Sequence, residues 1–211
     1  MKNAVLDGSI ALAAVERSLA ERHARTRDEV ARLIEAGISV MRSSRTVEPR
    51  VHDIIRTAGL SNQAFYRHFR SKDELLLAIL DHGLRELVAH LTTRMSTATS
   101  DAERVTSWIE GMLDQARNRV AADATRAFVL DSFRLTARFP DETRRSFDVL
   151  ITPLRDTLSS PGRRDAEADA TAIHHLTRGL LETHLARGTE PTEGEVAHVV
   201  GFALRGVGLG G

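Results

Sequence analysis

Cysteine is absent from the 211-residue sequence, and so is any run of about eighteen apolar residues. The absence of Cys excludes disulfide bonds and Cys-ligated metal sites, so stability must come from packing. The amino end also lacks a basic segment followed by a continuous apolar one, which argues against a secretion signal and a membrane partner. We therefore expect a globular protein of the cytoplasm, with 42% hydrophobic residues to fill its core.

An excess of charge is also missing, because 29 Lys and Arg residues balance 29 Asp and Glu residues. The balance is uneven along the chain: residues 22–75 contain eleven basic and seven acidic residues, whereas residues 76–211 contain sixteen and nineteen. Lysine is scarce, since only Lys2 and Lys72 occur. The modest positive charge of residues 22–75 is compatible with nucleic-acid binding but does not establish it.

Apolar residues recur at helical spacing almost throughout the chain, and no convincing stretch alternates with a period of two. This pattern predicts an all-α protein in which each helix buries one face. Capping boxes of the form Ser/Thr-x-x-Glu mark helix starts at Ser71, Ser100 and Thr192, and Pro or Gly residues mark helix ends at 159–164 and 187–191. The apolar stripes fall at residues 30–41, 51–58, 75–91, 105–113, 128–139, 147–158, 173–181 and 196–204.

The stretch TAGLSNQAFYRHFRSKDELL, residues 57–76, combines a turn with a very short helix. Gly59 enters the left-handed conformation easily and ends the preceding helix, and Ser61 caps the next one. Two short helices joined by so tight a turn cross steeply, as in a helix-turn-helix, whose second helix can lie in the major groove of DNA. Phe65 and Phe69 lie four residues apart on one face and are expected to pack inward.

The opposite side of this second helix carries side chains whose chemistry suits DNA. Gln63 can make paired hydrogen bonds to adenine, Arg67 can make them to guanine, and Ala64 can meet a thymine methyl group. Tyr66 suits a contact with sugar and phosphate. In the alternative interpretation these are ordinary solvated residues of a surface helix. Their combination with two packed Phe residues and the Gly turn favours DNA.

Lys72 occupies an unusual position for a cation. It lies in the first turn of the helix capped by Ser71, where a positive charge is unfavourable to the helix dipole. A bound phosphate would resolve this conflict, because the free backbone donors of a helix start favour an anion. In the alternative interpretation, Asp73 and Glu74 compensate the charge of Lys72.

The segment DIIRTAGLSNQAFYRHFRSKDELLLAIL, residues 53–80, resembles the DNA-binding signature of TetR-family transcriptional repressors, and the resemblance extends without gaps back to Leu33. It implies an all-α homodimer in which three amino-terminal helices bind a double-stranded DNA operator and a larger helical domain binds a small-molecule effector. The corresponding parts are an amino-terminal helical extension at 1–25, a helix-turn-helix domain at 26–72, and a ligand-binding and dimerisation domain at 73–211. The predicted DNA-binding residues are Arg50, Ser61, Asn62, Gln63, Ala64, Tyr66, Arg67, His68 and Lys72.

The sequence departs from the family pattern before the turn. Arg45 stands where such proteins usually have a Gly, and Met41 replaces the usual Phe. Glu48-Pro49 replaces the Thr-rich start of the second helix, where Pro is tolerated but a hydroxyl that commonly touches phosphate is missing. We expect Arg50 to take over that contact.

The resemblance also implies that the helices at 165–187 and 192–207 pair with their copies in a four-helix dimer interface. A symmetric dimer places its recognition helices about 34–36 Å apart, and this spacing predicts a palindromic operator. Small and apolar residues permit such packing, although burial within one monomer is the alternative. The predicted interface residues are Leu176, Gly179, Leu180, Val199, Val200 and Ala203.

Effector binding requires a cavity between the middle helices, and its predicted lining indicates an apolar or aromatic ligand. A ligand that favours a dimer with displaced recognition helices would release DNA. For each lining residue the alternative is a place in the plain core. The predicted lining residues are Trp108, Met112, Phe128, Phe133 and His175.

No other motif indicates a metal, a cofactor or catalysis. His174, His175 and His184 lack the i, i+4 spacing that puts two ligands on one helix face. The Gly-rich segment at 206–211 has no helix after it and does not predict a dinucleotide site. No arrangement of Ser, His and Asp stands out as catalytic, so we expect no enzyme activity. The competing hypothesis is an all-α small-molecule binding protein with weak or no specific DNA binding.

Overall fold

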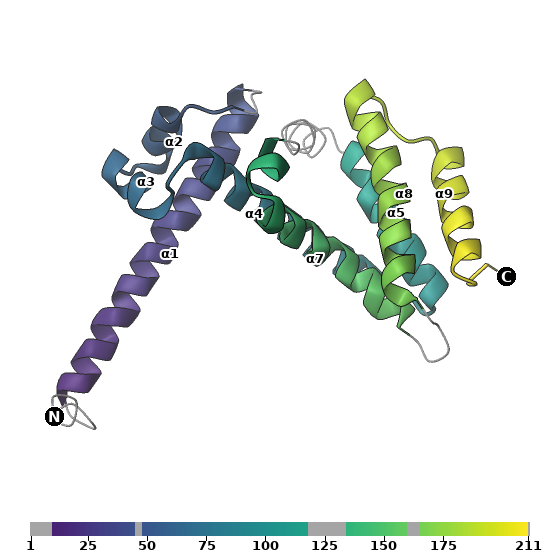
Figure 1. The fold of residues 1–211 in the computed structure, drawn as a ribbon, viewed down its shortest axis with the longest axis horizontal. Coiled ribbons are helices and arrows are strands. Elements are labelled where there is room, and N and C mark those ends of the chain that lie inside the picture. The colour runs from purple at the N-terminus through teal and green to yellow at the C-terminus, as the bar shows by residue number, and fades with distance from the viewer. Residues whose placement is uncertain (1–9, 45–47, 118–133, 160–164, 211) are drawn as a thin grey trace. The chain divides into compact units, whose positions relative to one another are not determined.

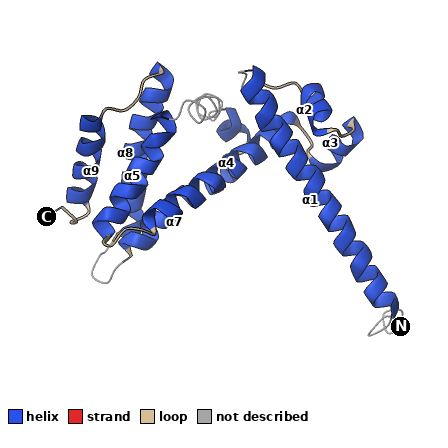
Figure 2. Cartoon of the chain, turned by 180° about the vertical axis from the view of Figure 1, so that it is seen from behind, coloured by secondary structure: helices blue, strands red, loops and turns tan. Residues whose placement is uncertain are grey.

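The computed structural model describes residues 10–44, 48–117, 134–159 and 165–210. Within these ranges every regular element is a helix and no strand is present, which confirms the all-α prediction (Figures 1 and 2). None of the helices in the described ranges is both long and apolar enough to cross a bilayer.

The chain divides into two compact units, with the division between Leu75 and Leu76. The amino-terminal unit contains α1 (Ile10–Ser44), α2 (Val51–Ala58), α3 (Asn62–His68) and the first turn of α4 (Lys72–Met95). The rest of α4 belongs to the carboxy-terminal unit, whose further described helices are α5 (Asp101–Arg117), α7 (Pro140–Leu158), α8 (Ala166–Arg187) and α9 (Glu193–Gly206).

The amino-terminal unit has a small core in which α1, α2 and α3 pack on one another. Leu33 of α1, Ile54 of α2 and Phe65 of α3 are fully buried. Phe69 is buried as well, so the predicted inward face of the second helix is confirmed. Met41, one of the departures from the family pattern, is also buried.

Helix α1 is longer than the sequence pattern predicted. The predicted boundary between an extension at 1–25 and the next helix at 26 falls inside α1, which runs without a break from Ile10 to Ser44. No Gly or Pro occurs from residue 10 to residue 36, so nothing in this stretch ends the helix. Residues 1–9 and Arg45 lie outside the described part of the chain.

The helix ends follow the predicted capping signals. Ser71 Oγ accepts a hydrogen bond from the Glu74 amide at 3.2 Å, and Ser100 Oγ accepts one from the Glu103 amide at 3.2 Å. At α9 the capping box is complete, because the Thr192 amide also donates to the carboxylate of Glu195 at 2.8 Å. These contacts satisfy backbone groups that the first turn of each helix leaves free.

The core of the carboxy-terminal unit lies where α5 packs against α7, α8 and α9. Trp108 of α5 is fully buried, and its Nε1–H donates to the Leu150 carbonyl of α7 at 3.2 Å. Three residues after that carbonyl, Pro153 occupies an interior position of α7. The indole therefore fills the core and also ties two helices together.

His174 of α8 lies in this core beside Trp108. Its side chain is 2% exposed, and the two rings meet edge to face with centroids 6.2 Å apart. Neither ring nitrogen has a hydrogen-bond partner among the described residues. Burial lowers the pKa of His174 to about 4, with smaller contributions from the charges of Arg178 and His175, so the imidazole is neutral at pH 7.

This burial makes the free energy of unfolding depend on pH. The imidazole titrates near pH 6.5 when unfolded and near 4 when folded, so the unfolded state binds more protons between these values. Stability that is present above pH 6.5 is therefore lost as the pH falls through this window. Between neutral pH and pH 4.5 we expect this titration to lower the free energy of unfolding of the wild-type protein by on the order of 2 kcal/mol. In His174→Phe this decrease should be absent. Urea unfolding of both proteins at the two pH values measures this, and equal losses would contradict it.

Candidate nucleic-acid interface

The turn between α2 and α3 is built on Gly59, which adopts φ 63° and ψ 35°. This left-handed conformation lets the Leu60 amide donate back to the Ile55 carbonyl at 3.1 Å and closes the end of α2, as predicted. Arg32 of α1 donates from Nη2 to the Ala58 carbonyl at 2.5 Å and to the Gly59 carbonyl at 3.3 Å. Helix α1 therefore holds the turn in place, because its Arg32 side chain donates to the carbonyl oxygens of the turn.

Helix α3 begins at a side-chain cap and presents a polar face. Ser61 Oγ accepts a hydrogen bond from the Ala64 amide at 3.1 Å, which confirms the predicted cap. Tyr66 is 56% exposed, and Asn62, Gln63 and Arg67 are exposed as well. We call these four residues the α3 face. Their exposure agrees with the predicted geometry, and their contact with DNA remains a prediction.

Ala64 does not belong to this face, because only 5% of its surface is exposed. It lies one helical turn before His68, on the side of α3 that faces α1. A buried methyl group has little surface to offer to thymine, so the burial of Ala64 does not support the predicted contact.

His68 and Arg67 both reach back to one carboxylate of α1. The Nε2 atom of His68 lies 2.6 Å from Oε2 of Glu29, and Nη2 of Arg67 donates to the same oxygen at 2.5 Å. The hydrogen bond from His68, followed by that from Arg67, lowers the pKa of Glu29. The His68 side chain is only 7% exposed, so His68 belongs to this contact rather than to the predicted DNA-binding set. Sequence reasoning missed Glu29, which carries no local signal.

Lys72 also has an acidic neighbour within the amino-terminal unit. Its Nζ lies 3.8 Å from Oε2 of Glu48, and the Lys72 side chain is 29% exposed. Lys72 therefore does not require a bound anion, because Glu48 offsets part of its charge. Arg50 precedes α2 with its side chain exposed and makes no side-chain cap, so it remains available for the predicted phosphate contact.

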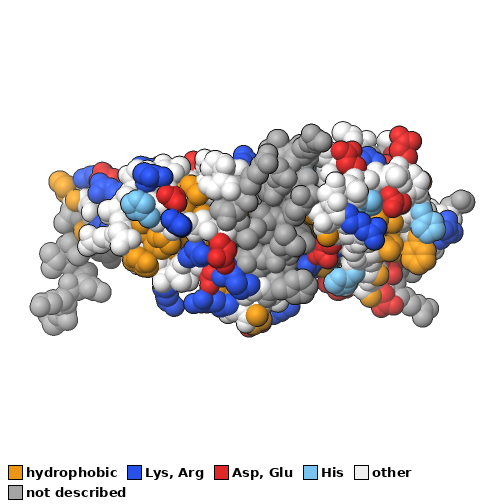
Figure 3. Space-filling view, turned by 90° about the horizontal axis from the view of Figure 1, so that it is seen from above, with side chains coloured by type: hydrophobic (Ala, Val, Ile, Leu, Met, Phe, Trp, Pro, Cys, Tyr) orange, Lys and Arg blue, Asp and Glu red, His pale blue; other side chains and the backbone are white. Residues whose placement is uncertain are grey.

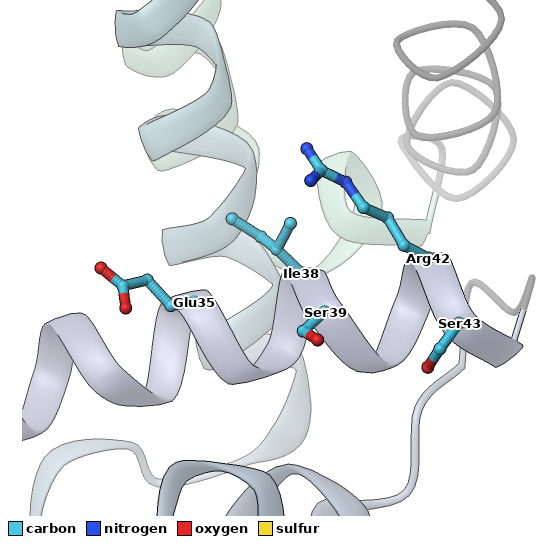
Figure 4. Close-up of a pocket in the computed structure, with 5 residues that line it drawn as sticks. All are labelled: Glu35, Ile38, Ser39, Arg42 and Ser43. Carbon is cyan, nitrogen blue, oxygen red and sulfur yellow. The ribbon is translucent and has the colours of Figure 1, made fainter.

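The outer face of α1 carries a pocket that the sequence did not predict. The lining residues lie along one side of the helix, as Figure 4 shows, and they are Glu35, Ile38, Ser39, Arg42 and Ser43. They alternate along the helix with the buried residues Leu33, Ala36 and Val40, so they point away from the core of this unit.

The face shown in Figure 3 has Lys and Arg side chains spread over the amino-terminal unit, with acidic ones among them.

The residues predicted to line the effector cavity differ in burial, and two of them lie outside the described residues. Trp108 and Met112 are buried in the carboxy-terminal unit, whereas Phe128 and Phe133 lie outside the described residues. His175 is exposed, and the adjacent His174 points inward in its place, so the effector contact of His175 stays a prediction. Neighbouring residues of a helix point about 100° apart. The i, i+4 spacing from the buried Ala170 to His174 was the signal that could have found this register.

Of the residues predicted at the dimer interface, two are buried within the protomer and four are at least partly exposed. Val199 and Ala203 are 7% and 3% exposed because they share the face of α9 that packs on α5, so little of their surface is free for the predicted interface. Leu176, Gly179, Leu180 and Val200 keep some exposure. Phe202, which the sequence reasoning did not select, is 58% exposed.

Within the described residues, no cluster of three metal-ligating side chains occurs.

The conformation of Gly59 generates a prediction about stability. At φ 63° an added side chain is strained, and a Cβ would also meet Arg32 Nη2 at 3.1 Å. We expect Gly59→Ala to lower the free energy of unfolding by about 1–2 kcal/mol. The matched control is Gly83→Ala in α4, where a Cβ meets no atom within 4 Å and Ala has the higher helix propensity. Chemical denaturation checks both, and equal effects of the two substitutions would refute the role of the turn.

Comparison with known proteins agrees with this geometry. Residues 50–79, from the residue before α2 into α4, match the family model described as bacterial regulatory proteins, tetR family. The chain is 27% identical over 126 residues to the HTH-type transcriptional regulator BetI of Rhizobium meliloti (strain 1021), and 26% identical to BetI of Brucella anthropi. The first of these matches covers 60% of this chain and 60% of the length of its relative.

Solved structures of the same architecture extend the likeness to the carboxy-terminal helices. FadR of Bacillus halodurans has a TM-score of 0.64 at 15% identity, covering 83% of this chain and 94% of that chain. FadR of Bacillus subtilis, solved in complex with stearoyl-CoA, has a TM-score of 0.60 at 13% identity, covering 84% and 96%. These proteins are described as transcriptional regulators and not as enzymes. Residues 50–79 of this chain are thus similar to the DNA-binding segment of the tetR family of bacterial regulatory proteins, and the chain shares the fold of these solved regulators.

Proposed function

We propose that the protein is a ligand-responsive transcriptional repressor that binds a palindromic operator as a homodimer. The observation that carries the proposal is the α3 face: a short capped helix, fixed by the fully buried Phe65, presents Asn62, Gln63, Tyr66 and Arg67 to solvent. Amide and guanidinium groups can pair with base edges in the major groove. A phenol hydroxyl can contact phosphate and fix the register of the helix on the duplex.

The carboxy-terminal unit is the proposed place of effector binding. The buried Trp108 and Met112 are the apolar residues that we propose to contact the effector, and the neutral His174 beside Trp108 is a polar group that lacks a partner among the described residues. An apolar or aromatic effector suits these residues, and the stearoyl-CoA complex of one structural neighbour is consistent with an apolar ligand. An effector lowers DNA affinity only to the extent that it prefers the conformation that does not bind DNA.

The surface of α8 and α9 supports the proposed homodimer. Leu176 and Phe202 are large apolar side chains that are 37% and 58% exposed. Gly179 and Val200 also keep exposure and permit close approach of a second copy. A twofold dimer makes the two α3 faces equivalent and thereby requires related half-sites in the operator.

A small-molecule binding protein with weak or no specific DNA binding is the second candidate. It is favoured by the two carboxylates that engage the cations of the amino-terminal unit, Glu29 with Arg67 and Glu48 with Lys72. Each pair reduces the positive charge available to phosphates. Binding that does not depend on DNA sequence would favour this candidate.

The two candidates differ in how cationic substitutions affect binding to duplex DNA from the protein's own upstream region. Arg67→Ala is expected to relax the preference at one base pair by about 1–3 kcal/mol, because Arg67 reads a base edge. Lys72→Ala is expected to weaken binding to all duplexes and to reduce the dependence of affinity on salt, because Lys72 contacts phosphate. Tyr66→Phe is likewise expected to weaken binding to all duplexes.

Fluorescence anisotropy with the upstream duplex, single-base variants of it and a scrambled duplex measures these effects. The control is Arg144→Ala in α7, which removes one exposed Arg from the carboxy-terminal unit. Equal affinity of the wild-type protein for the upstream and scrambled duplexes, with a control indistinguishable from Lys72→Ala, would favour the second candidate.

A further inference from the structure

We infer that Glu29 of α1 is a positioning residue that orients the guanidinium of Arg67 and so helps to set which base pair α3 prefers. The inference rests on the proposed function, because it assumes that the α3 face reads DNA. It assigns a role in specificity to a side chain that lies in a different helix from the reading residues, 38 positions earlier in the chain.

The geometry centres on one oxygen atom. Oε2 of Glu29 accepts from Arg67 Nη2 at 2.5 Å and lies 2.6 Å from His68 Nε2. The Glu29 side chain is 15% exposed and that of His68 is 7% exposed, so both are held by their surroundings. The Arg67 side chain is 55% exposed. The largely covered pair of Glu29 and His68 therefore forms a support for an exposed guanidinium.

The chemistry of Arg explains what this support achieves. A free Arg side chain loses about 2 kcal/mol of rotamer entropy when a single conformation is selected. Glu29 holds Arg67 through Nη2, and a guanidinium has five N–H donors, so donors remain for the two acceptors of a guanine edge. A side chain that is oriented before binding loses less freedom on the DNA and tolerates fewer alternative partners.

The charge of Glu29 argues against a role in packing alone. A carboxylate beside a DNA-binding surface repels phosphates, so it lowers the attraction that all sequences share. The same carboxylate fixes the one exposed Arg of α3 and thus favours selectivity over general affinity. On the same helix, Arg32 holds the carbonyl oxygens of Ala58 and Gly59, so α1 fixes both the turn and the reading side chain.

The test is a selection on duplex DNA with randomised sequence, carried out with wild type, Glu29→Ala, Arg67→Ala and the double variant. We expect Glu29→Ala to reduce discrimination at the base pair read by Arg67 by roughly tenfold, within the range that a bidentate Arg contact provides. The double variant should show no further loss at that position, because both substitutions remove the same interaction. Preferences at the other positions should stay as in the wild type.

Glu35→Ala is the matched control, since it removes one acidic side chain from the outer face of the same helix. It should leave every base preference unchanged. Thermal unfolding of each variant shows whether it is folded. If Glu29→Ala does not fold, Glu29→Gln replaces it, because Gln keeps an acceptor oxygen without the charge; its discrimination should lie between those of wild type and Arg67→Ala.

Three results would overturn the inference. The first is a wild-type base profile in Glu29→Ala or Glu29→Gln, with or without a uniform loss of affinity, since this indicates a merely structural role. The second is a double variant that loses further discrimination at the position read by Arg67. The third is a wild-type protein without any base preference, which contradicts the proposed function itself and is thereby distinguished from the first two.

Discussion

The burial of Phe65 is the constraint on which the candidate interface depends. Helix α3 has only seven residues, and a helix of that length is not stable in water by itself. Phe65 is fully buried where α3 packs on α1 and α2, and its ring also meets Tyr66 edge to face with centroids 5.1 Å apart. The direction of the α3 face therefore follows from the packing of an apolar side chain on its opposite side.

Polar contacts from α1 also help to fix the position of α3. Arg32 holds the turn around Gly59, and Glu29 holds Arg67 and His68 at the other end of α3. The charges of the amino-terminal unit are thus partly used within it, and Lys72 with Glu48 gives a second instance. A modest net positive charge combined with such pairs suits selective recognition better than strong general attraction to DNA.

The parts of this site that follow from local sequence could be predicted. The left-handed Gly59, the cap at Ser61 and the inward Phe65 and Phe69 each depend on residues within four positions of one another. Contacts between distant segments could not be predicted in the same way. Glu29 meets His68 across 39 positions, and no periodicity encodes such a pair.

The errors in register have a related cause. An apolar stripe locates a buried face only to within about one residue, because neighbouring side chains on a helix point about 100° apart. For this reason His175 was predicted to point inward where His174 does, and Ala64 was predicted on the exposed side of α3. Val199 and Ala203 were assigned to a dimer because sequence alone does not distinguish burial against α5 from burial against a second copy.

Hydrogen exchange of backbone amides, measured with and without the upstream DNA duplex, tests whether α3 binds the DNA. If it does, the duplex slows exchange at residues 61–68 and around Lys72, where we expect the α3 face and the start of α4 to meet the DNA. Protection confined to residues 76–210, with the amides of α3 unchanged in the presence of saturating DNA, would show that α3 does not bind.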